Sequence, residues 1–156
     1  MVMTAKWRSA RRMSLLAALS VGVIITTASP ASAATNLSVD PTTGLQDGQR
    51  VTAVGSGFAP HTTVYVVECS NNGSAAERGC DLQDGDYQQA TTQADGSFST
   101  ALVVRRSFVG IIPGGGGATG MIDCSVAPGC AVFAAVADAS SYAGPVTLSF
   151  SGSTQR

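Results

Sequence analysis

The chain has 156 residues, and its nine Lys and Arg against ten Asp and Glu give a formal charge of −1 at pH 7. Only 12 % of the residues are charged, so the chain is not rich in the cations with which proteins neutralise nucleic-acid phosphates. The length suits one small domain preceded by a targeting segment.

The N-terminus has the pattern of a secretory signal peptide. Four cationic residues precede an apolar run at residues 15–25, and the small residues Ala-Ser-Ala follow at 31–33. The run is too short to span a membrane permanently, and the A-x-A pattern permits cleavage after residue 33. We therefore expect residues 1–33 to be removed, which leaves a secreted domain of residues 34–156 with no membrane attachment.

The route of export and the charge of the mature chain follow from the same segment. Arg11-Arg12 would fit a twin-arginine address, but paired cysteines without a cofactor motif favour general secretion of the unfolded chain. Cleavage leaves five Lys and Arg against ten Asp and Glu, a net charge of about −5, with no lysine and no tryptophan. Direct nucleic-acid binding by this acidic protein is not expected.

Beyond residue 34 the pattern is that of an all-β protein. Apolar residues at every second position, or continuous β-branched runs, recur between turn signals, and no window has a helical repeat. About seven strands are expected, the first around Leu37 and Val39 and the others at 50–55, 63–69, 87–94, 97–104, 130–137 and 146–150.

The turns and the strand count indicate the fold class. Asp95-Gly96 predicts a two-residue hairpin between the strands at 87–94 and 97–104, because these residue types tolerate positive φ. Seven short strands in about a hundred residues favour a Greek-key sandwich of the immunoglobulin type. A small closed barrel is the architectural alternative.

Four cysteines remain after cleavage: Cys69, Cys80, Cys124 and Cys130. In an exported chain they are expected to form disulfides, and a zinc site is disfavoured because the C-x-x-C spacing and the histidine partners are missing. Three pairings are possible in principle. The sequence-local one, Cys69 with Cys80 and Cys124 with Cys130, would close two small loops, each worth roughly 2–3 kcal/mol.

No catalytic or metal-binding constellation stands out. His61 is the only histidine and lies in a turn, so no serine or cysteine has an evident base, and we expect no enzymatic activity. Asp81, Asp84 and Asp86 lack the rest of a calcium loop, and no metal is expected there. The glycine-rich run 113–120 formally matches a nucleotide-binding pattern without the helix that should follow; a mobile loop is the better interpretation.

Several segments carry a resemblance to a known family, the neocarzinostatin apoproteins. The stretch Arg-Arg-Ser-Phe-Val-Gly at 105–110, followed by Asp-Cys and a nearby second cysteine, is the most specific. The likeness runs in the same order over almost all of the mature chain, at 47–49, 94–96, 102–110, 122–124 and 146–150.

The resemblance implies a seven-stranded immunoglobulin-like sandwich with two disulfide-closed ribbons flanking a cleft. It further implies a secreted, monomeric antibacterial and antitumour chromoprotein. Such a protein holds a labile, non-covalent enediyne chromophore in the cleft, and the released chromophore, not the protein, attacks DNA. The protein would perform no chemistry, because its function is to bind and to exclude water.

The resemblance also assigns candidate ligand-binding residues. Tyr87 takes the place of an aromatic wall, and Pro113 and Gly114 take the place of the pocket lip. Asn71 stands where a family member has a tryptophan, and Phe133 replaces a glycine of the pocket floor, so its ring would fill volume. The remaining candidates, from the strand after Cys130, are Ala131 and Ala135.

Two hypotheses from different classes follow. The first is a non-enzymatic carrier of an apolar natural product. The second is a ligand-free extracellular interaction module that keeps the scaffold. Phe133 and Asn71 suggest it, because both depart from the family's pocket residues.

Overall fold

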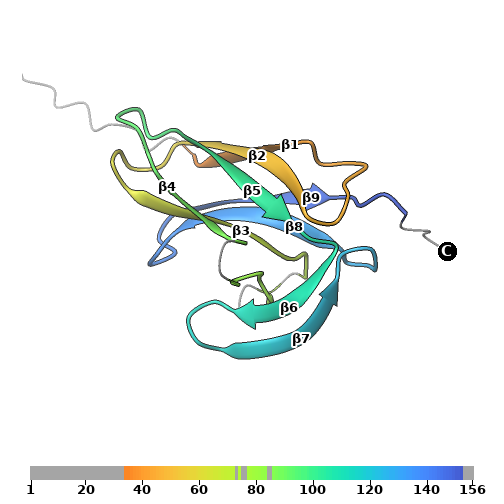
Figure 1. Ribbon diagram of the computed structural model, residues 1–156. Helices are drawn as coiled ribbons and strands as arrows, with labels where there is room; N and C mark the ends of the chain where they lie inside the picture. The colour runs from red at the N-terminus through yellow and green to blue at the C-terminus, as the bar shows by residue number, and fades with distance from the viewer. Residues whose placement is uncertain (1–33, 73, 75–76, 84–85, 153–156) are drawn as a thin grey trace, which may run out of the picture. The chain divides into compact units, whose positions relative to one another are not determined.

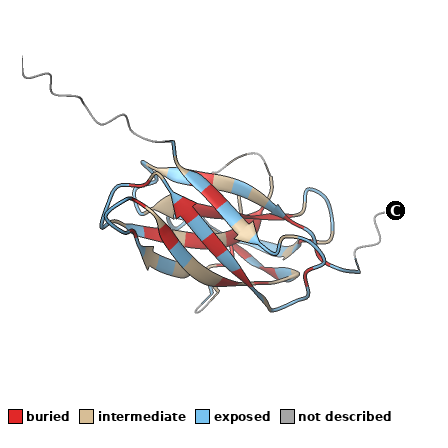
Figure 2. Cartoon of the chain, turned by 90° about the horizontal axis from the view of Figure 1, so that it is seen from above, coloured by how far each residue is buried: buried red, intermediate tan, exposed pale blue. Residues whose placement is uncertain are grey.

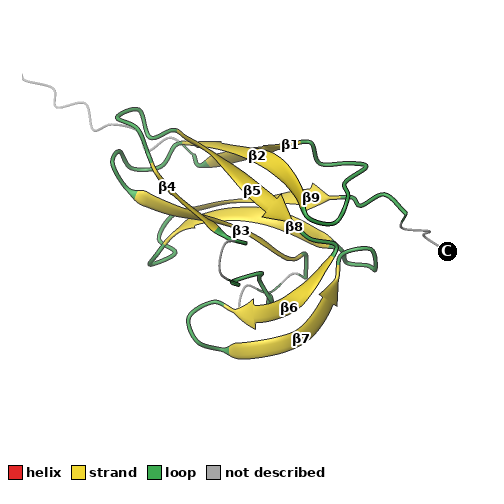
Figure 3. Ribbon diagram, viewed as in Figure 1, coloured by secondary structure: helices red, strands yellow, loops and turns green. Residues whose placement is uncertain are grey.

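A computed structural model describes residues 34–72, 74, 77–83 and 86–152 of the protein. Their backbone consists of strands and loops without a helix (Figure 3), and none of these residues belongs to a helix long and apolar enough to cross a membrane. The expected signal peptide at 1–33 lies outside the described residues. The strands are β1 (Asn36–Asp40), β2 (Gln49–Ser56), β3 (Thr63–Ser70), β4 (Gln88–Thr91), β5 (Phe98–Val104), β6 (Ser107–Ile112), β7 (Gly117–Asp123), β8 (Cys130–Val136) and β9 (Tyr142–Leu148).

The strands form two sheets and a separate ribbon (Figure 1). One sheet has the order β1-β2-β5, the other has the order β4-β3-β8-β9, and β6 and β7 form a two-stranded ribbon. Every pairing between these strands is antiparallel. The all-β immunoglobulin-like prediction is confirmed, and the ribbon accounts for two strands beyond the expected seven.

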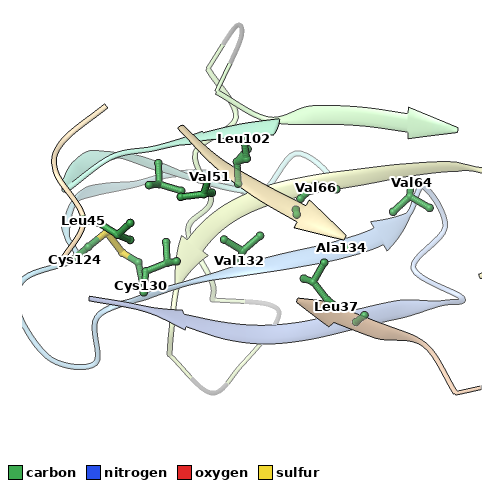
Figure 4. Close-up of a cluster of buried hydrophobic side chains, with 14 of the residues drawn as sticks. Leu37, Leu45, Val51, Val64, Val66, Leu102, Cys124, Cys130, Val132 and Ala134 are labelled. Atoms are coloured by element: carbon green, nitrogen blue, oxygen red, sulfur yellow. A yellow bond between two sulfur atoms is a disulfide. The ribbon is translucent and has the colours of Figure 1, made fainter. Parts of the chain in front are cut away.

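The core lies between the two sheets. Burial alternates along β2, where Val51 and Ala53 are buried and their neighbours are exposed, as expected for a strand with one wet face. Figure 2 shows bands of buried and exposed residues along the strands. Figure 4 shows the buried side chains of this layer, with the Cys124–Cys130 disulfide beside Leu45 at one end of the cluster. Both disulfides join the sequence-local partners, Cys69 with Cys80 and Cys124 with Cys130.

The hairpin predicted at Asp95-Gly96 is not formed, although the turn itself is present, with a hydrogen bond from the Gly96 N–H to Gln93 O at 3.0 Å. β4 pairs with β3 and β5 pairs with β2, so the chain crosses from one sheet to the other. Phe98 accounts for the crossing: it lies opposite Gly55, where a Cβ atom would come within 2.1 Å of its ring, and it packs against Phe58. A single-sheet hairpin would remove this ring from the core.

The glycine-rich run also differs from the prediction. Only its first four residues, 113–116, form the tip of a hairpin, and the rest belongs to β7, which pairs with β6. Glycine has low β propensity, so the strand is invisible in the sequence, and β6 supplies the pairing that stabilises it. The last strand likewise begins at Tyr142, earlier than expected. Its first half gives no strand signal in the sequence, because it contains Gly144-Pro145.

Candidate ligand-binding groove

The floor of the groove is the outer face of β3 and β8. Residues of a strand alternate between faces, so Val64 and Val66 enter the core while Tyr65 and Val67 face the other way. The register places the outward residues of the two strands opposite one another. They form three cross-strand pairs: Tyr65 with Ala135, Val67 with Phe133, and Cys69 with Ala131.

The Cys69–Cys80 disulfide closes one end of this floor. The Ser70 N–H donates to Gly79 O at 2.9 Å, and Cys80 exchanges two backbone hydrogen bonds of 2.9 Å with Ile111 of β6. The disulfide covers Ala131, which is completely buried, and forms a small apolar cluster with it and Phe133. This loop therefore joins the β6–β7 ribbon to the sandwich, and the tip of the ribbon, at Pro113 and Gly114, lines the groove.

Two glycines let the ribbon approach the disulfide loop closely. A Cβ atom on Gly79 would lie 3.0 Å from the Gly110 Cα, and a Cβ atom on Gly110 would lie 3.0 Å from the Gly79 Cα. The same added atoms would come within 2.3–2.6 Å of the Thr119 and Ile122 side chains. Any larger residue at either position would push the ribbon away from the floor.

The groove consists of two adjoining hollows that share Phe133 in their walls. The hollow of about 550 Å³, here called the arginine lobe, has Arg78, the Cys69–Cys80 disulfide and Pro145 in its walls. The hollow of about 440 Å³, here called the tyrosine lobe, has Tyr65, Tyr87, Leu82 and Gly114 in its walls. Both lobes are lined by Val67, Pro113, Phe133, Ala135 and Ala139.

The tyrosine lobe presents two aromatic rings. The centroids of Tyr65 and Tyr87 lie 6.5 Å apart with an interplanar angle of 34°. Tyr87 directly follows Asp86, whose Oδ1 accepts a hydrogen bond of 2.9 Å from Arg105 Nη2. This ion pair ties the segment that carries Tyr87 to the end of β5, so the ring has a fixed base from which to stack on a flat ligand.

The arginine lobe combines a cation with an aromatic ring. The Arg78 guanidinium carbon lies 4.0 Å from the centroid of the Phe133 ring, within the range of a cation–π contact. Arg78 Nη2 donates to Asn72 O at 3.3 Å. Phe133 is only 7 % exposed and lines both lobes, so its ring does not lie free in either of them.

Of the predicted site residues, Tyr87, Pro113, Gly114, Phe133 and Ala135 line the groove. Ala131 belongs to the floor row but lies beneath the disulfide. Asn71 lines neither lobe; its backbone N–H donates to Gly129 O at 2.9 Å and so joins the two disulfide loops.

Sequence reasoning missed several lining residues. Tyr65 and Val67 could have been found, because side chains alternate between the faces of a strand and these two occupy the outward positions of a recognisable one. Arg78, Tyr142 and Pro145 carry no such signal, since they come from a disulfide loop and from the hidden half of β9.

A buried carboxyl group lies under the floor, on its core side. Glu68 is completely buried; its Oε2 accepts a hydrogen bond of 2.6 Å from the Arg105 N–H, and its Oε1 lies 3.5 Å from Cys124 Sγ. Burial raises the pKa of Glu68 to about 8, with a smaller contribution from the Asp81 charge, against the opposing effect of the Arg105 N–H. Glu68 is therefore protonated at neutral pH.

Asp81 is the second buried acid of this region. Its carboxylate has no hydrogen bond of good geometry within the described residues, and Arg105 Nε lies 4.0 Å from its Oδ2. Burial, followed by the charge of Asp86, raises its pKa. Glu68 also lies near both sulfurs of Cys124 and Cys130, but these are bonded to each other and provide no thiolate for a metal.

Comparison with known proteins agrees with the fold and covers most of the described part of the chain. The model of the neocarzinostatin family matches residues 37–150. The antitumor antibiotic C-1027 apoprotein of Streptomyces globisporus is 36 % identical over 120 residues, which are 77 % of this chain and 80 % of that protein. Apokedarcidin of Actinomycete sp. (strain L585-6 / ATCC 53650) is 37 % identical over 95 residues, 60 % of this chain and 78 % of the relative.

Solved structures show the same relationship. Macromomycin superimposes with a TM-score of 0.63 at 27 % identity, covering 74 % of this chain and 99 % of the other. The solution structure of apokedarcidin gives a TM-score of 0.57 at 33 % identity, with 76 % of this chain and 99 % of the other covered. Because the family model spans well over half of the chain and the architecture agrees, the protein belongs to the neocarzinostatin family.

Proposed function

We propose that this protein is a secreted carrier that binds a labile, apolar, enediyne-type chromophore in the groove between β3, β8 and the β6–β7 ribbon. The bound chromophore is shielded from water, and its release gives antibacterial and antitumour activity through damage to DNA. The protein itself does not bind nucleic acid, is not an enzyme and acts as a monomer.

The groove is the observation that carries this proposal. Its lobes of about 550 and 440 Å³ are in the size range of small-molecule sites and are lined mainly by aliphatic and aromatic side chains. Five residues assigned from the family resemblance meet there. The antitumor antibiotic C-1027 apoprotein matches over 80 % of its length, which supports a role in carrying an antibiotic.

Retention of the ligand by shape agrees with the chemistry of the lining. The lobes contain no histidine, cysteine thiol or carboxylate among their described residues that could attack a bound molecule. The disulfide loop and the ribbon are joined by backbone hydrogen bonds, so the walls are held in place before a ligand arrives. A preformed apolar groove binds without a large ordering cost.

The direct test is the protein purified from its native culture. The mature chain has three tyrosines and no tryptophan, so absorbance at wavelengths beyond the tyrosine band reports a bound chromophore. We expect such absorbance, an organic-solvent extract containing one small molecule, and an N-terminus at Ala34 after signal cleavage. The control is the same chain produced in a host that does not make the chromophore.

A colourless native protein with no extractable molecule would contradict the carrier proposal. That outcome would favour the ligand-free interaction module. The observation that favours this alternative is the Phe133 ring, which fills part of the groove. A second measurement uses the extracted molecule: its half-life in water should lengthen when the colourless protein is added back, and unchanged decay would count against protection.

A further inference from the structure

Arg78 is the one charged residue among the described residues that line the two lobes. The tyrosine lobe has no charged side chain in its wall, and the rest of the arginine lobe is formed by aliphatic, aromatic, proline and disulfide groups. A single cation in an otherwise apolar groove requires an explanation, because burying charge without a partner is unfavourable.

Arg105, the other half-buried arginine of this region, has ion-pair partners and a structural role. Arg105 donates to Asp86 Oδ1 at 2.9 Å and lies 4.0 Å from Asp81. Arg78, in contrast, makes no ion pair within the described residues. Its side chain has one hydrogen bond there, from Nη2 to the Asn72 carbonyl, although a guanidinium carries five N–H donors.

The remaining donors of Arg78 are poorly satisfied. Its Nε is buried and has no hydrogen-bond partner within the described residues, as is also true of Arg105 and Arg106, so what distinguishes Arg78 from Arg105 is the missing ion pair. Its guanidinium lies over the Phe133 ring, which accepts no ordinary hydrogen bond. A ligand oxygen that draws the guanidinium slightly into the groove would satisfy these donors and would form a charge-assisted hydrogen bond in an apolar setting.

We infer that the arginine lobe binds an anionic oxygen group of the ligand, while the tyrosine lobe holds its aromatic ring system. The ligand class is therefore an aromatic compound with a carboxylate, phenolate or similar acidic oxygen on one side, placed across Phe133. This inference rests on the proposed function of the groove and specifies the chemistry of its occupant. Arg78 is the specificity-determining residue, and Tyr65 and Tyr87 form the aromatic platform.

Two fluorescent probes with the same ring framework test this assignment in the mature chain. One is 1-anilinonaphthalene-8-sulfonate, which carries an anionic oxygen group, and the other is N-phenyl-1-naphthylamine, which lacks it. We expect both to bind, the anionic probe several-fold more tightly. Arg78→Met keeps the length and apolar stem of the side chain and should weaken the anionic probe about tenfold, or about 1.4 kcal/mol, while changing the neutral probe less than twofold.

Two further variants define the controls. Arg78→Lys retains the charge and should recover part of the loss, whereas Arg50→Met, on an exposed position of β2 in the other sheet, should change neither probe. A readout that needs no variant is the Arg78 Nε–H resonance of the wild-type protein. It should shift on addition of the anionic probe and stay in place with the neutral one.

The outcomes separate the two proposals. If both probes bind and depend on Tyr87 but Arg78→Met affects them equally or not at all, the anionic-group inference is overturned and the groove function stands. If neither probe binds, or neither depends on Tyr87, the groove function loses its support and the inference fails with it. Equal wild-type affinity for the two probes would also overturn the inference.

Discussion

The two faces of the sheet β4-β3-β8-β9 differ in what covers them. The inner face packs on the opposite sheet through Val64, Val66 and Val132, which are completely buried. The outer face is partly covered by the Cys69–Cys80 loop and by the tip of the β6–β7 ribbon, and the groove remains between them. Neighbouring residues of one strand therefore have different tasks: one set supports the fold and the other shapes a binding surface.

The size of the outer residues explains the depth of the groove. Ala135 leaves space above β8 and lines both lobes, whereas the Phe133 ring fills part of that space and the disulfide covers Ala131. On the inner face the exception is Glu68, an acid in an apolar layer. The comparison thus predicts large stability effects on the inner face, with an unusual dependence on pH, and binding effects on the outer face.

The largest expected effect concerns Glu68. Its folded-state pKa of about 8 lies above the ordinary value of 4.5, so the folded protein keeps a proton that the unfolded chain has lost between these pH values. The stability contribution of this group is complete below pH 4.5 and is lost as the pH rises toward 8. The free energy of unfolding should fall by roughly 3 kcal/mol between pH 5 and pH 7.5.

Glu68→Gln is the matched variant, because its amide oxygen can still accept from the Arg105 N–H. Urea unfolding of the variant should give a much flatter pH profile and a higher stability than wild type at pH 7.5. A small residual slope of the same sign is expected from Asp81, whose pKa is also raised. A wild-type stability that rises from pH 5 to pH 7.5 would contradict the assignment.

The second prediction compares two neighbouring valines. Val66 is completely buried between the sheets, and Val67 is half-buried in the groove floor. Val66→Ala should lower the free energy of unfolding by about 2 kcal/mol, and Val67→Ala by under about 1 kcal/mol, because only the first leaves a cavity in a closed core. Probe binding should change only for Val67→Ala. Equal losses of stability would show that the two faces are packed alike.

The third prediction concerns the contact between the wall and the disulfide loop. Gly110→Ala places a methyl group against the Gly79 backbone and the Ile122 side chain, which should cost about 1–2 kcal/mol of stability. The ribbon should move outward and weaken probe binding as well. Val109→Ala, on an exposed position of the same strand, is the control and should leave binding unchanged. Tight probe binding by Gly110→Ala would mean that the ribbon is not a wall.

The smallest expected effect is at the aromatic platform. Tyr87→Ala removes one of the two rings of the tyrosine lobe and should weaken the neutral naphthylamine probe about fivefold, or about 1 kcal/mol. Tyr142→Ala is a useful comparison, because that ring is 64 % exposed at the edge of the arginine lobe and should matter less. Tighter binding after removal of Tyr87 would contradict the proposed platform.

Local sequence patterns were sufficient for the strands and for part of the site. The alternation around Val51 and the nearly continuous apolar run around Val66 predicted strands, and side chains of a strand point to opposite faces because of the backbone alone. The same alternation, applied to β3, identifies which residues can reach the groove. The proximity of the cysteines in the chain also made their local pairing an available choice.

Only the tertiary structure decided which strands pair and where the ribbon lies. The Asp95-Gly96 turn is compatible with a hairpin or with a crossing, and the burial of Phe98 against Gly55 selected the crossing. The glycine-rich β7 has no signal of its own, and Arg78 reaches the groove through the closure of a disulfide loop. These features depend on contacts between residues far apart in the chain, which local propensity does not encode.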